Sequence, residues 1–248
     1  MPIMLALLSG CSLFSFCVPL TPHEIHFSGT LEVPEGFVDA VDGCVLYPDG
    51  ILTPYGFSGK FGIGEGEFAS PAAIEVEGGR IYVLDRGKRK IMVFTLKGEF
   101  LFEFGENLED PVAFSLDGLG RVYVLDRVLY SVLVFTTQGE YLYSFGSYGT
   151  GDAFFENPSL LCAWGNKVAV KDKDKIKVFD YRGEFLYSIR LPAISMDAGK
   201  RLYVLLPDGL YLVDGKRKRL LSGYWERVRA GKEGIYLIKN DRIEVYTW

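Results

Sequence analysis

The side chains in this sequence with the capacity for chemistry are carboxylates and cations, because histidine and cysteine are scarce. The two histidines are His23 and His26, and no Cys/His metal spacing, nucleophile elbow or Walker-type phosphate loop occurs. Three acids, Asp39, Glu75 and Asp197, lie within apolar stretches. Such carboxylates can bind a hard cation such as calcium, or they can be solvated or structural groups. The sequence predicts no catalytic residue and no cofactor, and it leaves a metal site undecided.

These residues belong to a repeated unit. Residues 78–105 return as residues 119–146, and weaker copies begin at Asn166, Lys200 and Glu233. Each copy contains short β-branched and aromatic runs and a tight Gly turn, and a proline opens a further apolar strand before the first three copies. No segment has a sustained 3.6-residue apolar period. Four short strands per repeat predict an all-β propeller, which leaves only short, protected sheet edges.

Two segments resemble the NHL-repeat family of β-propellers. They are FGIGEGEFASPAAIEVEGGRIYVLDRGKRKIMVF, at residues 61–94, and FGSYGTGDAFFENPSLLCAWGNKVAVKDKDKIKVF, at residues 145–179. Each contains FG, a Gly-rich acidic loop, Phe, Pro and then the strands of the family pattern. The resemblance covers residues 60–190 well and the remainder weakly. It implies a propeller whose loop face binds peptides, proteins or RNA.

The repeats count to six blades, with one strand missing from the last. Residues 24–33 form a strand before the first complete unit, and we expect this strand to pair with the C-terminal one and close the ring. The predicted organisation is an apolar leader at residues 1–22 and a single propeller at residues 23–248. The inner strands are expected to begin near Phe37, Ala72, Val112, Ser159, Ala193 and Arg227.

The leader carries no formally charged side chain, and its residues 8–11 (LSGC) resemble a bacterial lipobox. The resemblance implies cleavage before Cys11, lipidation of that cysteine and anchoring at the cell envelope. Two departures are the absence of Lys or Arg before the apolar stretch and the apolar residues after Cys11. The alternatives are an uncleaved membrane anchor, since residues 1–20 just reach spanning length, and a cytoplasmic chain.

Composition limits the partners. A net charge of −5 argues against nucleic acid as a partner of the surface as a whole. Few amide side chains, together with 24% charged residues, are typical of a thermophile. Cys44 and Cys162 are predicted on opposite sides of the ring, as small buried side chains without a disulfide.

Charged loops are expected to gather on one face. Basic turns between the second and third strands and acidic connections between blades share that face. They form either a salt-bridged rim or a recognition face for a protein, peptide or glycan. In both cases Asp85 and Asp126 are expected to accept backbone hydrogen bonds from the adjacent turn. The candidate binding residues are Arg86, Lys88, Arg89, Arg127, Tyr130, Tyr148 and Lys173. The aromatic residues near this face that could act as anchors are Tyr130, Tyr148, Phe154 and Phe155.

A second basic run, residues 216–219 (KRKR), is predicted in a turn on the opposite face, where it is either solvated or close to anionic lipid. Three functions remain open. The first is a non-catalytic binding or scaffold propeller at the cell envelope. The second is a lactonase- or lyase-like enzyme that uses carboxylates and a divalent metal. The third is an intracellular RNA- or protein-binding module. Propeller lyases similar to the streptogramin-inactivating enzymes need histidine, which no unit from Phe37 onward contains.

Overall fold

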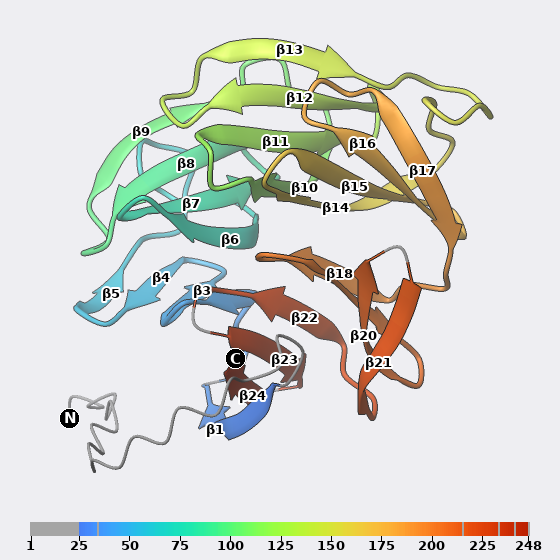
Figure 1. The fold of residues 1–248 in the computed structure, drawn as a ribbon. Helices are drawn as coiled ribbons and strands as arrows, with labels where there is room; N and C mark the ends of the chain where they lie inside the picture. Colours follow the sequence, from blue (N-terminus) through green and yellow to red (C-terminus); the bar gives the residue numbers. More distant parts are fainter. Residues whose placement is uncertain (1–24, 34, 215, 233, 241, 248) are drawn as a thin grey trace.

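A computed structural model describes residues 25–33, 35–214, 216–232, 234–240 and 242–247. The regular structure of these residues is entirely β, in six four-stranded antiparallel sheets arranged as blades around a central axis (Figure 1). The predicted six-bladed, all-β propeller is therefore confirmed. The described residues contain no helix with the length and apolarity needed to cross a membrane. Residues 1–24, which include the predicted leader with Cys11, lie outside the described residues.

Each blade contains its strands in chain order from the axis outward, apart from the last blade. Blades 1 and 2 contain β2 (Asp39–Val41), β3 (Cys44–Tyr47), β4 (Gly50–Thr53) and β5 (Gly56–Ser58), then β6 (Pro71–Glu77), β7 (Arg80–Asp85), β8 (Lys90–Thr95) and β9 (Phe100–Phe104). Blades 3 and 4 contain β10 (Pro111–Leu116), β11 (Arg121–Asp126), β12 (Ser131–Thr136) and β13 (Tyr141–Phe145), then β14 (Pro158–Trp164), β15 (Lys167–Asp172), β16 (Lys175–Asp180) and β17 (Phe185–Arg190). Blade 5 contains β18 (Ser195–Ala198), β19 (Leu202–Leu206), β20 (Gly209–Asp214) and β21 (Lys216–Ser222).

The last blade joins both ends of the chain. It contains β22 (Arg227–Ala230), β23 (Gly234–Lys239) and β24 (Arg242–Thr247), and its outer strand is β1 (His26–Glu32). β1 pairs antiparallel with β24, from His26 opposite Thr247 to Glu32 opposite Arg242. The expected closure by the N-terminal strand is confirmed. It covers one edge of β24 that would otherwise be free to pair with another chain.

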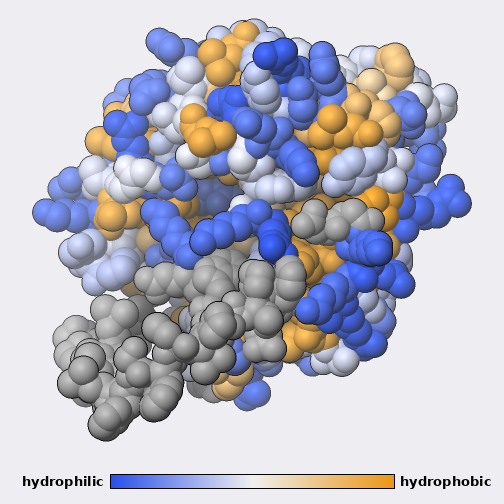
Figure 2. Space-filling model, viewed as in Figure 1, coloured by the Kyte–Doolittle hydropathy of each residue, from blue (hydrophilic) through white to orange (hydrophobic). Residues whose placement is uncertain are grey.

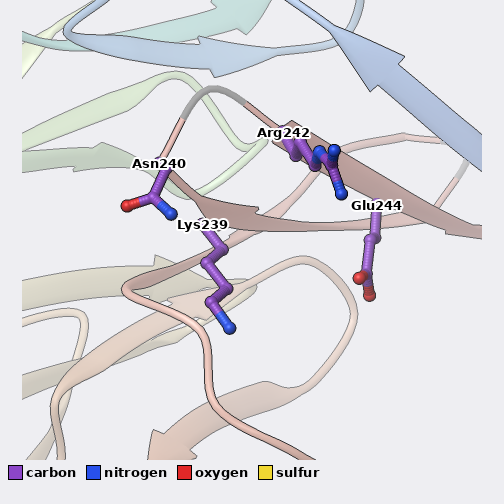
Figure 3. A pocket seen from close by; sticks show the side chains of 4 residues that line it. All are labelled: Lys239, Asn240, Arg242 and Glu244. Carbon is purple, nitrogen blue, oxygen red and sulfur yellow. The ribbon is translucent and has the colours of Figure 1, made fainter.

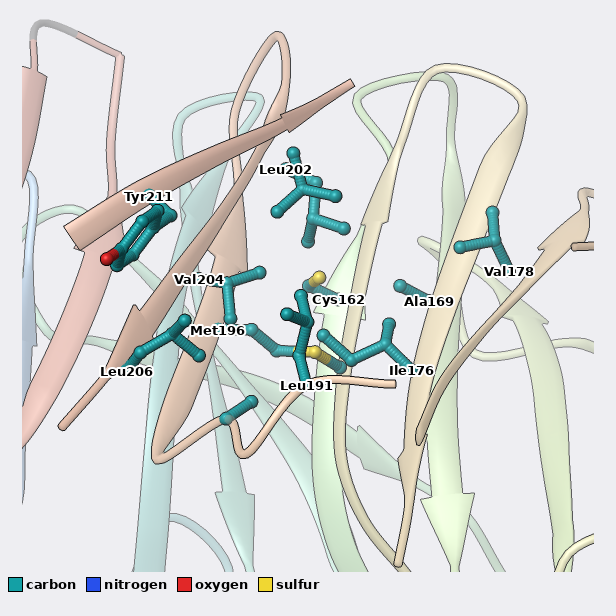
Figure 4. Packing of buried hydrophobic residues seen from close by; sticks show 12 residues of the cluster. Cys162, Ala169, Ile176, Val178, Leu191, Met196, Leu202, Val204, Leu206 and Tyr211 are labelled. Carbon is teal, nitrogen blue, oxygen red and sulfur yellow. The ribbon is translucent and has the colours of Figure 1, made fainter. Parts of the chain in front are cut away.

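The core is divided among the junctions between blades. The buried apolar residues that the structure describes form six clusters, one at each junction. Figure 4 shows the cluster between blades 4 and 5, where Cys162 and Met196 pack against Ile176 and Val204. Cys44 lies at the junction of blades 1 and 2, and both cysteines are buried free thiols, as predicted. The β-branched runs of each repeat are buried because both faces of a blade contact neighbouring blades.

Neighbouring inner strands are joined by side chains. Asp39 Oδ2 accepts a hydrogen bond from the Ile74 amide at 3.1 Å, and Ser195 Oγ accepts one from the Val228 amide at 3.2 Å. These strands belong to different sheets, so no ladder connects their backbones. The side-chain acceptors therefore satisfy buried amides that would otherwise lack a partner.

Two faces follow from the connections. The loop face holds the turns between second and third strands and the connections between blades. The opposite face holds the other turns of each blade. The sequence placed the basic run at residues 216–219 in a turn, which is wrong: these residues form the first half of the outer strand β21. They stay extended because the strand pairs with β20 up to Lys216 opposite Asp214.

Candidate functional site

A charged cluster, here called the channel cluster, lies on the inner strands. Arg229 on β22 reaches three carboxylates from three other blades: Glu75 at 3.0 Å, Asp197 at 3.2 Å and Asp39 at 3.6 Å. Arg227, two residues earlier on the same strand, pairs with Asp39 at 3.0 Å. Glu75 belongs to blade 2, which is not next to blade 6 in the ring. Arg229 therefore connects blades across the axis.

Burial and charge shift the titration of this cluster. Burial raises the pKa of the Glu75 carboxyl to about 8, although the positive charge of Arg229 opposes the shift. Burial likewise raises the pKa of Asp197. Burial alone would lower the pKa of Arg229, but Asp197, Asp39 and Glu75 together raise it well above its ordinary value.

The guanidinium takes the position that the sequence considered for a cation. Asp39, Glu75 and Asp197 do come together, as a metal site would need, but Arg229 lies among them. A divalent ion would have to displace a buried, paired guanidinium to reach these carboxylates. In the part of the chain that the structure describes, no group of three or more His, Cys, Asp or Glu residues is arranged to hold a metal ion.

Sequence reasoning missed Arg227 and Arg229. The available signal was the pattern Arg-x-Arg in the inner strand of the last repeat, a strand type that is otherwise mostly apolar or small in this chain. Alternation places both side chains on the same face of β22. The acids of the other inner strands provide the complementary charges.

We expect Glu75→Gln to flatten the dependence of stability on pH. The folded carboxyl has a pKa of about 8, whereas its ordinary value is 4.5. A raised folded pKa contributes stability that is fully present below pH 4.5 and is lost as the pH rises through 8. The free energy of unfolding of the wild type, measured with urea, should therefore fall between pH 5 and pH 8. Glu75→Gln should fall less, and Glu77→Gln in the same strand should match the wild type. Equal slopes for wild type and Glu75→Gln would contradict this assignment.

Buried aspartates organise the loop face. Asp85 Oδ2 accepts the Ala69 amide at 2.8 Å, while Oδ1 accepts those of Ser70 and Lys88. Asp126 makes the corresponding set in blade 3, with the amides of residues 109, 110, 128 and 129. Each carboxylate joins a connection between blades to a turn within a blade. The predicted role of Asp85 and Asp126 is confirmed, and their charge is used in holding the loops.

Two long loops on this face have the same construction. In one, Phe61 forms an isolated bridge with Phe68, and in the other Tyr148 forms one with Phe155. Phe68 and Phe155 are fully buried and hold the loops on the core. The sequence named Phe155 as a possible surface anchor, and this is wrong. Its ring lies 5.7 Å from that of Phe179 in the core between blades 3 and 4.

The predicted basic and acidic sets meet on the loop face. Arg86 and Arg127 both pair with Asp110, at 2.9 and 2.6 Å, and Arg89 pairs with Glu109 at 3.0 Å. The further pairs are Lys90 with Glu106 at 2.6 Å and Lys173 with Glu156 at 2.7 Å. Most of these side chains are well exposed, so each pair contributes only about 0–1 kcal/mol. Together they form an ion-paired rim.

Lys88 differs from the other candidates. Its side chain is only 6% exposed, and its ammonium donates to the Gly64 carbonyl at 2.9 Å and pairs with Glu103. Lys177 makes a similar contact in the second long loop, donating to the Gly151 carbonyl at 3.1 Å. Lys88 therefore supports a loop from beneath and is largely covered from solvent.

An aromatic patch lies beside the rim between blades 3 and 4. Tyr130 and Tyr148 stack edge to face with their ring centroids 4.9 Å apart. Tyr148 is 69% exposed, and the nearby side chains that complete the patch are Val128, Leu129 and Phe154, all exposed. Tyr130 has a φ of 50°, a left-handed backbone conformation, in the turn between β11 and β12. The patch thus contains both predicted tyrosines.

An open pocket of about 350 Å³ lies beside β24, lined by Lys239, Asn240, Arg242 and Glu244 (Figure 3). The Glu244 carboxylate accepts hydrogen bonds from Trp225 Nε1 and from the Tyr246 hydroxyl, each at 3.0 Å. The Lys239 ammonium lies 5.7 Å from the Tyr224 ring centroid. These groups are engaged in structural contacts.

The chain is similar to known propellers in fold. No family model and no curated protein matches it. Selenomethionine-substituted virginiamycin B lyase from Staphylococcus aureus aligns with a TM-score of 0.61 and 11% identity, over 91% of this chain and 100% of that one. A catalytically inactive histidine-to-alanine variant of that lyase, with quinupristin, gives 0.63 and 11%, over 90% and 89%. The WD40 β-propeller domain of Doa1 gives 0.59 and 10%, over 90% and 97%. These identities show a shared fold, and the NHL resemblance stays a prediction.

Proposed function

We propose that this chain is a non-catalytic binding propeller, held at the cell envelope by its N-terminal segment, which recognises a protein or peptide on its loop face. The observation that carries the proposal is the aromatic patch beside the ion-paired rim. Tyrosine is favoured at interface centres because it offers a large, rigid contact area with one polar group. A polar rim around such a patch is typical of protein interfaces.

The channel supports binding over catalysis. Its carboxylates are paired with Arg229 and Arg227, so none is presented as a free base beside an open site. The fold likeness to virginiamycin B lyase is the reason to consider the enzyme alternative. The catalytically inactive histidine-to-alanine variant indicates that the lyase depends on a histidine. Of the two histidines here, His26 lies on the outer strand β1, far from the inner strands, and His23 lies outside the described residues.

The Doa1 likeness shows that the fold is shared with a WD40 propeller domain as well as with a lyase, so fold alone does not decide between binding and catalysis. The ion pairs of the rim support a protein partner. A rim in which each cation has a carboxylate neighbour presents alternating charge, which favours a specific protein surface over a uniform polyanion such as RNA. The net charge of −5 adds to that preference.

Photo-cross-linking in the native host tests this function. Tyr148 and Tyr55 have the same exposed fraction, 69%, and lie on the loop face and the opposite face respectively. We expect p-benzoylphenylalanine at position 148 to give a discrete adduct with one partner, and the same residue at position 55 to give none. Equal adduct patterns from both positions, or none from position 148, would contradict recognition on the loop face.

A further inference from the structure

The path of β1 shows from which face the leader departs. β24 runs from Arg242, next to the turn on the loop face, to Thr247 on the opposite face. Because β1 is antiparallel to β24 and starts with His26 beside Thr247, the chain enters β1 from the opposite face. Residues 1–24, which carry no Asp, Glu, Lys or Arg before Glu24, therefore connect to the propeller at the opposite face.

The basic run of β21 lies on the same face, in the neighbouring blade. Ile25 packs against the core between blades 5 and 6, and so do Leu220 and Leu221 of β21. β21 starts on the opposite face, where Lys216 lies opposite Asp214 in the strand register. Blades 5 and 6 are neighbours in the ring (Figure 1). The start of β1 and the start of β21 therefore lie on the same face, in neighbouring blades.

The cations at this place form what we call the basic edge: Lys200, Lys216, Arg217 and Lys218, all exposed. Lys200 adds to the run from the turn between β18 and β19. Blade 5 contains six basic residues and three acidic ones, and two of those acids are engaged elsewhere. Asp197 pairs with Arg229 in the channel, and Asp208 lies on the loop face near Arg219. A locally positive edge thus stands out on a protein with a net charge of −5.

We infer that the basic edge docks onto an anionic phospholipid surface and orients the propeller with its loop face away from the membrane. This inference rests on the proposed function, which anchors the chain by its leader. A single point of attachment does not by itself set an orientation. Each Lys or Arg near an anionic headgroup layer contributes attraction that falls off within a Debye length. The attachment point and the cations share one face, so tethering brings the basic edge within that range.

A different role for the same residues is edge protection. Exposed lysines on an outer strand discourage pairing with another chain. Figure 2 shows hydrophilic side chains interspersed with apolar areas on the visible surface. Reversing lysine to glutamate keeps a charge on the edge. It therefore preserves edge protection and removes attraction to anionic lipid.

Vesicle co-sedimentation of the full chain tests the inference. The probes are vesicles of phosphatidylcholine alone and of phosphatidylcholine with phosphatidylglycerol, at low salt and at high salt. We expect tighter binding to the anionic vesicles than to the neutral ones, even though the protein is acidic. This difference between the two vesicles should disappear at high salt. Lys216→Glu/Lys218→Glu should lower the binding to anionic vesicles about tenfold or more. Lys60→Glu/Arg190→Glu changes the net charge equally but lies on the loop face, and it should keep the wild-type preference.

The outcomes separate the inference from the proposed anchoring. Equal binding to both vesicles overturns the docking of the basic edge on anionic lipid and supports anchoring by the N-terminal segment. Binding to anionic vesicles alone supports the basic edge and contradicts the anchor. No binding to either overturns both. The same loss in both double variants would mean that only net charge matters, and it would overturn the inference. Binding to a DNA duplex without vesicle preference would assign the edge to nucleic acid and overturn it as well.

Discussion

Arg229→Met is expected to lower the free energy of unfolding by about 3–5 kcal/mol at pH 7, the effect of removing one partner from a buried charge network. Methionine keeps much of the apolar stem but leaves Asp39, Glu75 and Asp197 close together without a central cation. Chemical denaturation followed by tryptophan fluorescence measures the change. A loss below about 1 kcal/mol would contradict the view that Arg229 ties the blades together.

Arg227→Met is the matched control. Its guanidinium also pairs with Asp39 and donates to the Val38 carbonyl, but its side chain is 40% exposed. Solvent screens that pair, so a loss of about 1 kcal/mol is expected. The pH dependence adds a second check. Without Arg229 the pKa values of Glu75 and Asp197 lose the lowering effect of its positive charge, so Arg229→Met should recover stability relative to the wild type as the pH falls from 7 toward 5.

Deletion of residues 1–33 is expected to have the second large effect. It removes β1, which forms six paired positions with β24, and it removes the contacts of Ile25 and Val33 with the cores of blade 6. At a net 0.5–1 kcal/mol for each lost pairing, the loss amounts to roughly 3–6 kcal/mol. The melting temperature should fall by about 10 °C, and light scattering should detect association through the uncovered β24.

Deletion of residues 1–24 is the control, since it removes the leader and keeps β1 with its core contacts. Circular dichroism should give this shorter deletion the melting temperature of the full chain. If both deletions melt together with the full chain, β1 does not close the ring in solution. If both melt early, the leader rather than the strand stabilises the propeller.

The sequence was sufficient to predict those features that repeat within each unit. The strand runs, the Gly turns and the buried carboxylates Asp85 and Asp126 occupy the same positions in successive copies, so each copy supports the interpretation of the next. The missing strand in the last repeat predicted the closure by β1. These features depend on contacts within a blade or between adjacent blades.

The sequence was not sufficient for contacts across the axis. Arg229 and Glu75 lie in blades that are not neighbours, so their contact depends on the number of blades and on the height of each residue along the axis. The burial of Phe155 beside the exposed Phe154 was also missed, because adjacent aromatic residues in an irregular loop give no alternation to interpret. The ion pairs of Arg86, Arg89 and Arg127 fit the predicted charge sets, and their functional role stays a prediction.

The pairing of β1 with β24 also determines when the molecule can be completed during its synthesis. The first strand made waits for the last, because Glu32 and its partner Arg242 are 210 residues apart in the chain. At ordinary rates of translation that interval is about 10–40 s. Throughout this time the first five blades of the chain can assemble while the ring remains open. An emerging chain is therefore a partial propeller whose strand β1 has no partner until β24 has been made.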